Sequence, residues 1–250
     1  MLGKAFWLPV ATLWRRELIR FWREKARVLG FVGSPLVFWL VVGSGFGNLS
    51  FFFPGALTLT VMFSAVFSTM SLIEDRREGF LLSMLVSPAP RSALVVGKTL
   101  GSATLAWIQG LIFLAFAPLA GARLGWLQLA ESIGVIFLIS ITFTLLGFLI
   151  AWRTDSSQGF HAVMNLLLVP LWMLSGALFP ASGAHGWIKV VMAANPLTYS
   201  LALLRRVLDP NLAAGNPSLA VSLGVTLASA VVLLAAATAV ANQKRDRSSA

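Results

Sequence analysis

The sequence contains no cysteine, which excludes disulfide bonds, thiolate metal ligands and a cysteine nucleophile. It has two histidines, His161 and His185, which are too few and too isolated to predict a zinc site. Charged residues make up only 11%, against about 25% in an average soluble domain, and hydrophobic residues make up 58%. The chain therefore lacks the polar surface of a water-facing globule, and we interpret it as a membrane protein.

The sequence contains long apolar runs in place of the missing polar surface. A helix that crosses a bilayer needs about 20 apolar residues. Six segments qualify, and no soluble domain fits between any two of them; they are roughly 28–47, 51–73, 99–120, 132–152, 160–180 and 218–241. We predict an all-α membrane protein with six transmembrane helices in a single domain, 1–250, in which 28–180 holds spans one to five and 218–241 is span six.

Ionisable side chains are missing from the middle of all six predicted spans. There they cost about 2.5–3.5 kcal/mol or more and are kept mainly for function. The polar residues inside the spans are neutral, and we interpret them as hydrogen-bonding partners between helices; they are Ser64, Ser68, Thr69, Gln109, Thr142, Thr144 and Asn165. This pattern disfavours a proton- or sodium-driven carrier and an intramembrane hydrolase.

The net charge of +10 is distributed unevenly between the predicted connections. One side holds Lys4, Arg15, Arg16, Arg20, Arg23, Lys25, Arg27, Arg76, Arg77, Arg91, Lys98, Arg153, Lys244, Arg245 and Arg247. The other side holds Arg123, Lys189, Arg205 and Arg206. Basic residues gather on the cytoplasmic side of membrane proteins, so both termini are expected there. This bias accounts for most of the positive charge, and nucleic acid is not needed as a partner.

The segment 8–27 has an apolar stripe and a basic face at helical spacing. The stripe is Val10, Leu13, Trp14, Leu18, Phe21 and Trp22; the basic face is Arg15, Arg16, Arg20, Arg23 and Arg27. Such a helix lies in the membrane plane, with its aromatic rings among the headgroups and its arginines toward anionic lipid. The alternative is a simple positive-inside anchor, which would need the basic charge but not the apolar stripe.

The predicted connection 74–98 is the longest on the cytoplasmic side. It opens with five polar residues, Glu74 to Glu78, followed by Gly79 and a short amphipathic helix, Phe80–Val86. Pro88 and Pro90 end that helix, because proline cannot donate a backbone hydrogen bond. We interpret the short helix as a contact for a cytoplasmic partner; the alternative is an ordinary solvated loop.

Gly97-Lys98-Thr99 matches the end of a nucleotide-binding phosphate loop, G-x-x-x-x-G-K-[ST]. The first glycine of that motif is replaced by Ser92, and the residues between are bulky where a backbone must wrap closely around phosphate. We therefore expect no nucleotide site in this chain.

Two stretches carry a resemblance to ABC exporter permeases of the type-2 export class. The first resembles the pattern E-R-E-x-G-T-x-E-x-L-x-x-x-P…GK, on Glu74, Arg76, Glu78, Gly79, Leu85, Pro88, Gly97 and Lys98. The second is similar to the signature around the fifth span, on Ser175, Gly176, Phe179, Pro180, Trp187, Asn195, Pro196, Leu197, Thr198, Tyr199 and Arg205. Phe80 and Leu82 depart from the family's Thr and Glu, which implies more apolar docking.

The resemblance implies a transport subunit without catalytic residues, metal or cofactor of its own. It would pair with a second permease copy and two separate ABC ATPase subunits, which hold MgATP. The ATPase-coupling residues would be Glu74, Arg76, Glu78, Gly79, Phe80, Leu85 and Pro88. Lys98 would anchor at the cytoplasmic headgroups, and Gly97 with Gly101 would permit close helix packing.

The resemblance also places the translocation path at the interface of the two permeases, along spans one, two and five. The candidates there are Phe38, Trp39, Phe63, Phe67, Asn165 and Trp172. Their apolar, aromatic character favours a lipid-like or drug-like substrate, and a glycan remains open because aromatic rings stack on sugars.

The external segment 181–216 contains two apolar stretches separated by Asn195-Pro196. It is expected either to re-enter the outer leaflet as short helices, forming an outer gate with Phe179, Pro180, Asn195, Pro196 and Tyr199, or to lie on the membrane surface. The alternative to an energised exporter is a channel or scaffold that works without an ATPase. A membrane-embedded enzyme is the least favoured, since no cluster of titratable residues supports it.

Overall fold

The structure is a computed structural model that describes residues 2–23, 25–213 and 215–243. All regular elements in this part of the chain are helices, which confirms the all-α prediction. The α-helices are α1 (Leu2–Arg23), α2 (Lys25–Gly45), α3 (Leu49–Ser68), α4 (Ser71–Arg77), α5 (Phe80–Val86), α6 (Arg91–Leu114), α7 (Trp126–Arg153), α8 (Ser157–Trp172), α9 (Gly186–Ala194), α10 (Pro196–Leu208) and α11 (Leu219–Asn242). The short elements are η1 (Ala117–Ala120), the π-helical turn η2 (Met173–Ala177), η3 (Ala181–Gly183) and η4 (Pro210–Ala213).

Polar residues mark where the long helices begin. The side chains of Asn48, Ser156 and Ser218 accept hydrogen bonds from backbone N–H groups in the first turns of α3, α8 and α11. Asn195 does the same for α10, and Pro196 follows at the first helical position, where its missing N–H costs nothing. These caps divide a nearly continuous apolar sequence into separate helices.

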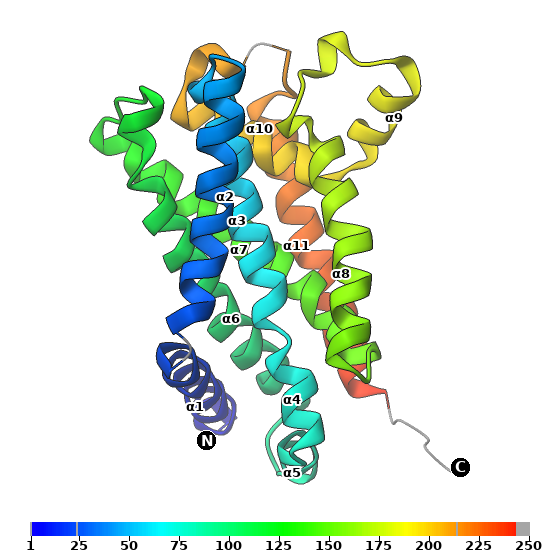
Figure 1. The fold of residues 1–250 in the computed structure, drawn as a ribbon. Helices are drawn as coiled ribbons and strands as arrows, with labels where there is room; N and C mark the ends of the chain where they lie inside the picture. Colours follow the sequence, from blue (N-terminus) through cyan, green and yellow to red (C-terminus); the bar gives the residue numbers. More distant parts are fainter. Residues whose placement is uncertain (1, 24, 214, 244–250) are drawn as a thin grey trace.

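Six helices, α2, α3, α6, α7, α8 and α11, run side by side along the long axis of the molecule (Figure 1). α3 is central: 83% of the residues in the most apolar window of Leu49–Arg77 are buried, against 11% for Leu219–Asn242. The core combines α3 with the facing sides of α2, α6 and α7 and includes Trp39, Phe53, Phe113 and Phe143. α11 packs mainly through small residues and exposes the rest of its surface.

By length and apolar composition, fewer helices could cross a membrane than the six that the sequence predicts. Among the described residues, four are long and apolar enough, Leu49–Arg77, Trp126–Arg153, Ser157–Ala177 and Leu219–Asn242. A fifth is counted if α9 and α10, which meet at a bend of 85°, form one broken span. In α2 the qualifying apolar part, Val32–Gly45, is shorter, and α6 contains several polar residues.

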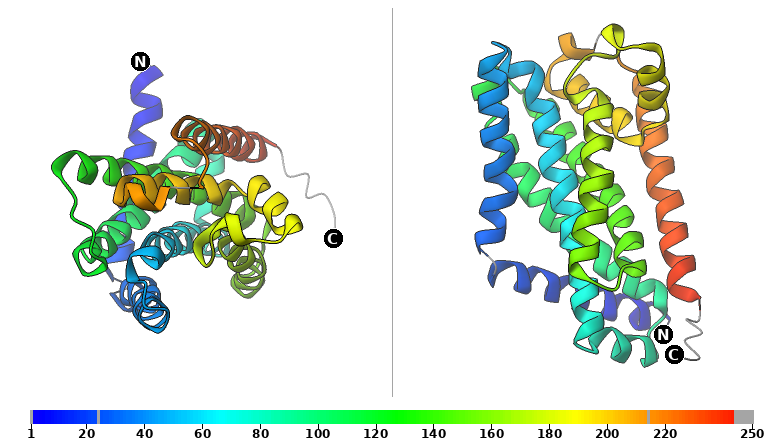
Figure 2. Two further views of the ribbon diagram at one scale, coloured as in Figure 1. Left: turned by 90° about the horizontal axis from the view of Figure 1, so that it is seen from above. Right: turned by 45° about the vertical axis from the view of Figure 1, so that its right-hand side comes forward.

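α1 lies across one end of the bundle, close to α4 and α5, and α9 and α10 lie at the other end (Figures 1 and 2). The helix predicted at 8–27 begins at Leu2 and ends at Arg23. The predicted loop 74–98 is largely helical: α4 occupies its start, α5 follows, and α6 already begins at Arg91. The helix predicted at Phe80–Val86 is confirmed.

Several neutral polar residues inside the bundle do not join neighbouring helices, and that prediction is wrong for them. Ser68, Thr69 and Thr142 donate to backbone carbonyls of their own helices, at 2.7, 2.6 and 2.8 Å. Hydroxyl side chains satisfy themselves in this way when a carbonyl three or four residues earlier lies within reach. Asn165 is exposed on α8.

Candidate functional site

The site that the structure assembles lies where α1 crosses α6, beside α4 and α5. A side chain at Gly97 would place its Cβ 3.0 Å from Leu13 Cβ, and at Gly101 2.7 Å from Glu17 Cβ. The two glycines therefore let the helices approach closely, as predicted. Gly97, Lys98 and Thr99 all lie within the regular helix α6, where the backbone cannot wrap around a phosphate.

Lys98 is the centre of a buried ion cluster and does not anchor at the headgroups, so that prediction is wrong. Its side chain is 3% exposed, and its Nζ lies 2.5 Å from Glu17 Oε1 on α1. It also contacts Asp75 on α4 and lies 3.3 Å from Ser71 Oγ. Burying an ammonium group is costly unless it is paired, and two buried carboxylates provide that pairing.

Two arginines of α1 extend the cluster. Arg16 Nη2 lies 2.7 Å from Asp75 Oδ1, and Arg20 pairs with Glu74 and lies 3.5 Å from Asp75. Contact with the Asp75 carboxylate raises the pKa of Arg16 above its ordinary value. The prediction that the arginines of this helix face lipid is therefore wrong for Arg16 and Arg20, because the acidic residues of α4 lie beside them; Arg15 is exposed.

Arg76 ties α4 to the end of α7. Its guanidinium donates to Thr154 O at 2.8 Å and Trp152 O at 2.7 Å, and lies 3.2 Å from Asp155 Oδ1. A cation at the last carbonyls of a helix satisfies groups that have no partner within the helix and complements the helix dipole. The polar segment that begins the predicted connection 74–98 is thus bound to α1, α6 and α7 through its residues on α4.

α5 begins at a sharp backbone reversal and presents an apolar tip. Gly79 has φ +76°, a left-handed conformation that favours glycine. Phe80 lies beneath the Arg16 guanidinium, 3.8 Å from the ring centroid, and Leu81 is buried. Leu82 and Val86, one turn apart, are 66% and 76% exposed.

The other predicted residues of this loop differ in their exposure. Leu85 is half-buried, whereas Glu78 and Pro88 are exposed. Between α5, α1 and the start of α6 lies an apolar groove of about 270 Å³, lined by residues that include Leu8, Leu13, Phe80, Met84 and Leu94. Leu82 and Val86 are not among the residues that line it, so α5 has both an inner contact with α1 and an exposed face.

The predicted path residues separate into a buried and an outer group. Trp39 and Trp172 are buried and donate to backbone carbonyls of α3, Leu49 O and Gly55 O, both at 2.8 Å. Trp39 packs on Phe53 and Phe113 within the protomer core. In the outer group, Phe38 and Phe63 are half-buried and Asn165 is exposed.

Two ring contacts link these residues across helices. Phe38 of α2 meets Trp172 edge to face, with ring centroids 5.3 Å apart. Phe67, which is buried, stacks on Phe63 within α3 and lies 5.0 Å from the His161 ring of α8. The structure therefore places aromatic residues of α2, α3 and α8 next to one another.

Among the predicted gate residues, Asn195 bonds to the end of α8, and Tyr199 bonds within the α9–α10 pair. Asn195 Nδ2 donates to Leu171 O at 2.6 Å and Leu174 O at 3.1 Å, and Tyr199 donates to Ala193 O at 2.7 Å. Phe179 and Pro196 are half-buried, and Pro180 is exposed. Asn195 thus connects the turn between α9 and α10 to α8.

Arg205, treated above as an external charge, is buried. Its Nη2 donates to Gly176 O at 2.6 Å, and its guanidinium lies 4.7 Å from the Phe51 ring centroid. Gly176 has φ +93°, which leaves its carbonyl outside regular helical bonding. Arg205 supplies the hydrogen-bond donor that the Gly176 carbonyl lacks, and it thereby links α10 to η2.

Sequence reasoning missed Glu17 and Asp75. Glu17 follows Val10 and Leu13 at helical spacing on the buried side of α1. An acidic residue among apolar positions indicates a buried basic partner on another helix. Asp75 had no such signal, because it lies in a run of charged residues that is typical of a solvated loop.

Comparisons with known proteins show which family the sequence resembles over most of its length. The family described as ABC-2 type transporter matches residues 9–208. The chain is 28% identical over 205 residues to the putative transport permease ycf38 of Cyanophora paradoxa, covering 76% of this chain and 71% of the relative. It is 27% identical over 223 residues to nodulation protein J of Rhizobium leguminosarum bv. trifolii, covering 82% of each.

A third relative is named for drug resistance. The chain is 23% identical over 228 residues to the probable doxorubicin resistance ABC transporter permease protein DrrC of Mycobacterium tuberculosis (strain CDC 1551 / Oshkosh), covering 84% of this chain and 78% of the relative. The similarity to all three relatives extends over most of each protein.

Proposed function

The chain belongs to the ABC-2 type transporter family, and from this premise we propose that it is the membrane-spanning subunit of an ATP-driven exporter. A second copy of the chain forms the permease pair, and two separate ABC ATPase subunits bind and hydrolyse MgATP. The chain itself contributes no nucleotide site; its role is to convert movement of the ATPases into movement of its helices.

The exposed tip of α5 is the observation that carries this proposal. Leu82 and Val86 project from a short helix that contacts α1 through Phe80 and Arg16 and follows α4 directly after Gly79. Arg76 and the Lys98 cluster in turn connect α4 to α1, α6 and α7. A partner that pushes on α5 displaces these helices together, because every connection is a buried or charge-assisted contact. ATP then shifts the population between inward-open and outward-open states through differential binding.

We place α1 in the cytoplasmic membrane interface and all six long helices across the bilayer. α1 lies across the end of the bundle where α11 ends (Figure 2), and most basic residues are assigned to that side. α2 and α6 complete the six spans by their position beside the four most apolar helices (Figure 1). Four polar residues of α6 are buried and so are withdrawn from lipid: Lys98, Thr99, Ser102 and Gln109.

The translocation path is proposed at the interface between two copies. α8 packs on its own protomer through a narrow stripe, Phe160, Met164, Leu168 and Trp172, and exposes most of its remaining surface. Asn165 lies on that outer surface and Phe38 and Phe63 are half-buried, whereas Phe67 and Trp39 support it from the core. A mainly apolar path with one amide suits a lipid-like or drug-like substrate, as the name of the mycobacterial relative also suggests, and a glycan less well.

The α9–α10 pair is proposed as a re-entrant outer gate. α10 is buried along most of its length, which a helix lying on the membrane surface would not be. Asn195 and Arg205 fasten it to α8, so movement of α8 is transmitted to the gate.

Charging the tip of α5 tests the function. We expect Leu82→Glu with Val86→Glu to abolish copurification of the proposed partner ABC ATPase, and to lower transport-coupled ATP hydrolysis at least tenfold, while the permease still inserts and folds. Leu127→Glu, which charges an equally exposed leucine at the opposite end, is the control. Unchanged copurification and transport in the double variant would instead favour a channel or scaffold that works without an ATPase.

A further inference from the structure

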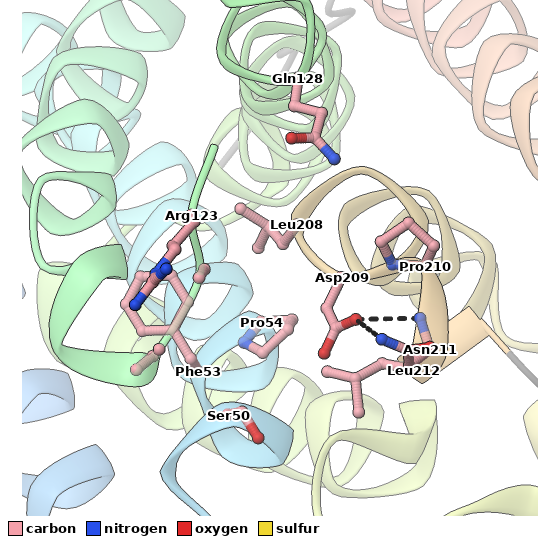
Figure 3. A pocket seen from close by; sticks show the side chains of 13 residues that line it. Ser50, Phe53, Pro54, Arg123, Gln128, Leu208, Asp209, Pro210, Asn211 and Leu212 are labelled. Atoms are coloured by element: carbon pink, nitrogen blue, oxygen red, sulfur yellow. Dashed lines mark hydrogen bonds between the residues drawn. The ribbon is translucent and has the colours of Figure 1, made fainter. Parts of the chain in front are cut away.

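A polar pocket of about 250 Å³ lies at the end of the bundle opposite α1. It is formed where four segments meet: the start of α3, the connection between η1 and α7, the first turn of α7, and the end of α10 with η4 (Figure 3). Its floor is apolar, from Phe53, Pro54 and Leu208. None of the residues proposed above for coupling, path or gate lines it.

The pocket brings two opposite charges together without joining them. Figure 3 shows Arg123 on one side and Asp209 on the other, with Pro54 and Leu208 between them. Asp209 Oδ1 accepts from Asn211 N at 2.9 Å and Asn211 Nδ2 at 3.0 Å, which fixes the carboxylate in place. Asp209 Oδ2 and the Arg123 guanidinium have no hydrogen-bond or ion-pair partner within the described part of the chain.

The remaining polar groups also leave hydrogen-bonding capacity open. Gln128 Oε1 accepts from Gly125 N at 2.9 Å, so the amide is oriented, and its Nε2 donors stay available. The Ser50 hydroxyl donates to Asn48 Oδ1 at 3.0 Å and can still accept a hydrogen bond. The pocket thus offers donors around Arg123 and Gln128 and a fixed acceptor at Asp209.

This arrangement fits a zwitterion that carries an anion and a primary ammonium group. A phosphate accepts from Arg123 and Gln128, because guanidinium geometry matches phosphate oxygens. An ammonium donates to Asp209 Oδ2. A quaternary choline nitrogen has no N–H to donate and prefers aromatic faces, and Phe53 is only 1% exposed. A purely anionic headgroup would meet the Asp209 carboxylate, and a sugar would find no exposed aromatic ring among the residues that line the pocket, because Phe53 is buried.

We propose that this pocket binds the phosphoethanolamine headgroup of a phospholipid in the outer leaflet. Its volume is below the roughly 300–1,000 Å³ of sites for drug-sized molecules, which suits a headgroup rather than a whole molecule. Trp126 and Leu127, beside the pocket on α7, are 89% and 72% exposed, as expected of an interfacial belt next to acyl chains. The assignment to the outer leaflet depends on the orientation in the proposed function, whereas the binding chemistry does not depend on it.

The experiment measures retention of short-chain lipids by the delipidated, purified full-length chain, using native mass spectrometry. Dihexanoyl lipids with phosphoethanolamine, phosphocholine and phosphoglycerol headgroups are compared with soluble glycerophosphoethanolamine. We expect phosphoethanolamine lipid to bind most tightly. Arg123→Gln should weaken it at least tenfold, and Asp209→Asn should remove the preference over phosphocholine.

Three further variants separate the pocket from general effects. Lys189→Gln and Glu131→Gln remove an exposed cation and an exposed carboxylate elsewhere and should bind like wild type. Ala122→Phe fills the pocket without changing charge and should lower phosphoethanolamine binding as much as Arg123→Gln does. Thermal unfolding of each variant confirms that the fold persists.

Equal retention of the three lipids by wild type, or unchanged retention in Arg123→Gln and Ala122→Phe, would overturn the proposal. Soluble glycerophosphoethanolamine that binds as tightly as the lipid would overturn the lipid assignment. These outcomes are independent of ATPase coupling, so failure of the pocket leaves the proposed exporter function untouched.

Discussion

Lys98 illustrates how a buried charge depends on all of its partners. It contacts Glu17 and Asp75, and Asp75 is shared with Arg16 and Arg20, so the cluster joins α1, α4 and α6 through alternating charges. Removing Lys98 leaves the buried Glu17 carboxylate without its cation, and breaking a buried ion pair in this way typically costs about 3–5 kcal/mol. Replacing a pair by apolar side chains of similar volume is far less costly.

We therefore expect Lys98→Met to lower the melting temperature of the purified protein by on the order of 10 °C. Lys98→Met combined with Glu17→Met should recover part of this loss, because no unpaired carboxylate then remains on α1. Thermal unfolding followed by tryptophan fluorescence measures both. A single variant as stable as wild type, or a double variant less stable than the single one, would show that the cluster does not hold α1 in place.

Gly101 tests the close approach of α1 and α6 at the same point. An added Cβ would meet Glu17 Cβ and Cγ at 2.7 Å, so α1 must shift and the contact of Glu17 with Lys98 is strained. We expect Gly101→Ala to destabilise the protein by about 1–3 kcal/mol, as overpacking does.

Gly134→Ala is the matched control for that variant. An added Cβ there meets nothing within 4 Å, so the substitution should be neutral or stabilising by up to about 1 kcal/mol through helix propensity. The same thermal unfolding assay compares the two, and equal stability of both variants would disprove the close contact.

At the scale of the elements, α5 depends on the reversal at Gly79. Proline fixes φ near −65°, far from the native +76°, and lacks the N–H that donates to Arg76 O. We expect Gly79→Pro to uncouple ATP hydrolysis from transport while the spanning helices still insert. ATPase and transport assays on the reconstituted complex measure this.

Gly215 provides a control with the same backbone angle, φ +76°, at the opposite end of the molecule. Gly215→Pro imposes the same local conflict but lies far from α5, so coupling should persist. Transport at the wild-type level in Gly79→Pro would contradict the role of α5, and loss of coupling in both variants would point to general misfolding.

The helices themselves follow from local patterns that a sequence displays. The apolar runs predicted the positions of all six long helices to within several residues. Gly79, Pro88 and Pro90 predicted the bounds of α5, because the backbone restrictions of glycine and proline act within a few positions. The extension of α6 back to Arg91 was missed, because Lys98 among apolar residues resembles the end of a span until its partners are known.

The ion cluster and the buried Arg205 could not be predicted in the same way. Glu17, Asp75 and Lys98 are far apart in the sequence, and their meeting depends on how α1 crosses the bundle. Arg205 was assigned to the external side by charge counting, which does not distinguish a solvated arginine from one that replaces a missing partner at Gly176. Such contacts are set by packing, and one sequence does not reveal the packing.

On the scale of the whole molecule, the surface is divided into an apolar middle and two chemically different ends. α8 and α11 expose most of their apolar side chains, including Leu166, Val231 and Val232. Contiguous exposed apolar surface of this extent marks contact with lipid or with another subunit. The helices α1 and α5 lie at one end, and α9 and α10 lie at the other (Figure 1).

The absence of cysteine makes the proposed orientation directly measurable, because any cysteine that is introduced is the only one. We expect Leu82→Cys to react with a membrane-impermeant maleimide only after cells are opened, since the α5 end is assigned to the cytoplasm by its excess of Lys and Arg. Leu127→Cys, similarly exposed at the opposite end, should react in intact cells. A reporter fused after Ala250 should likewise read as cytoplasmic. Labelling with the reverse pattern would invert the molecule in the membrane and place α5 beyond the reach of any ATP-driven partner, so this measurement tests the orientation on which coupling through α5 depends.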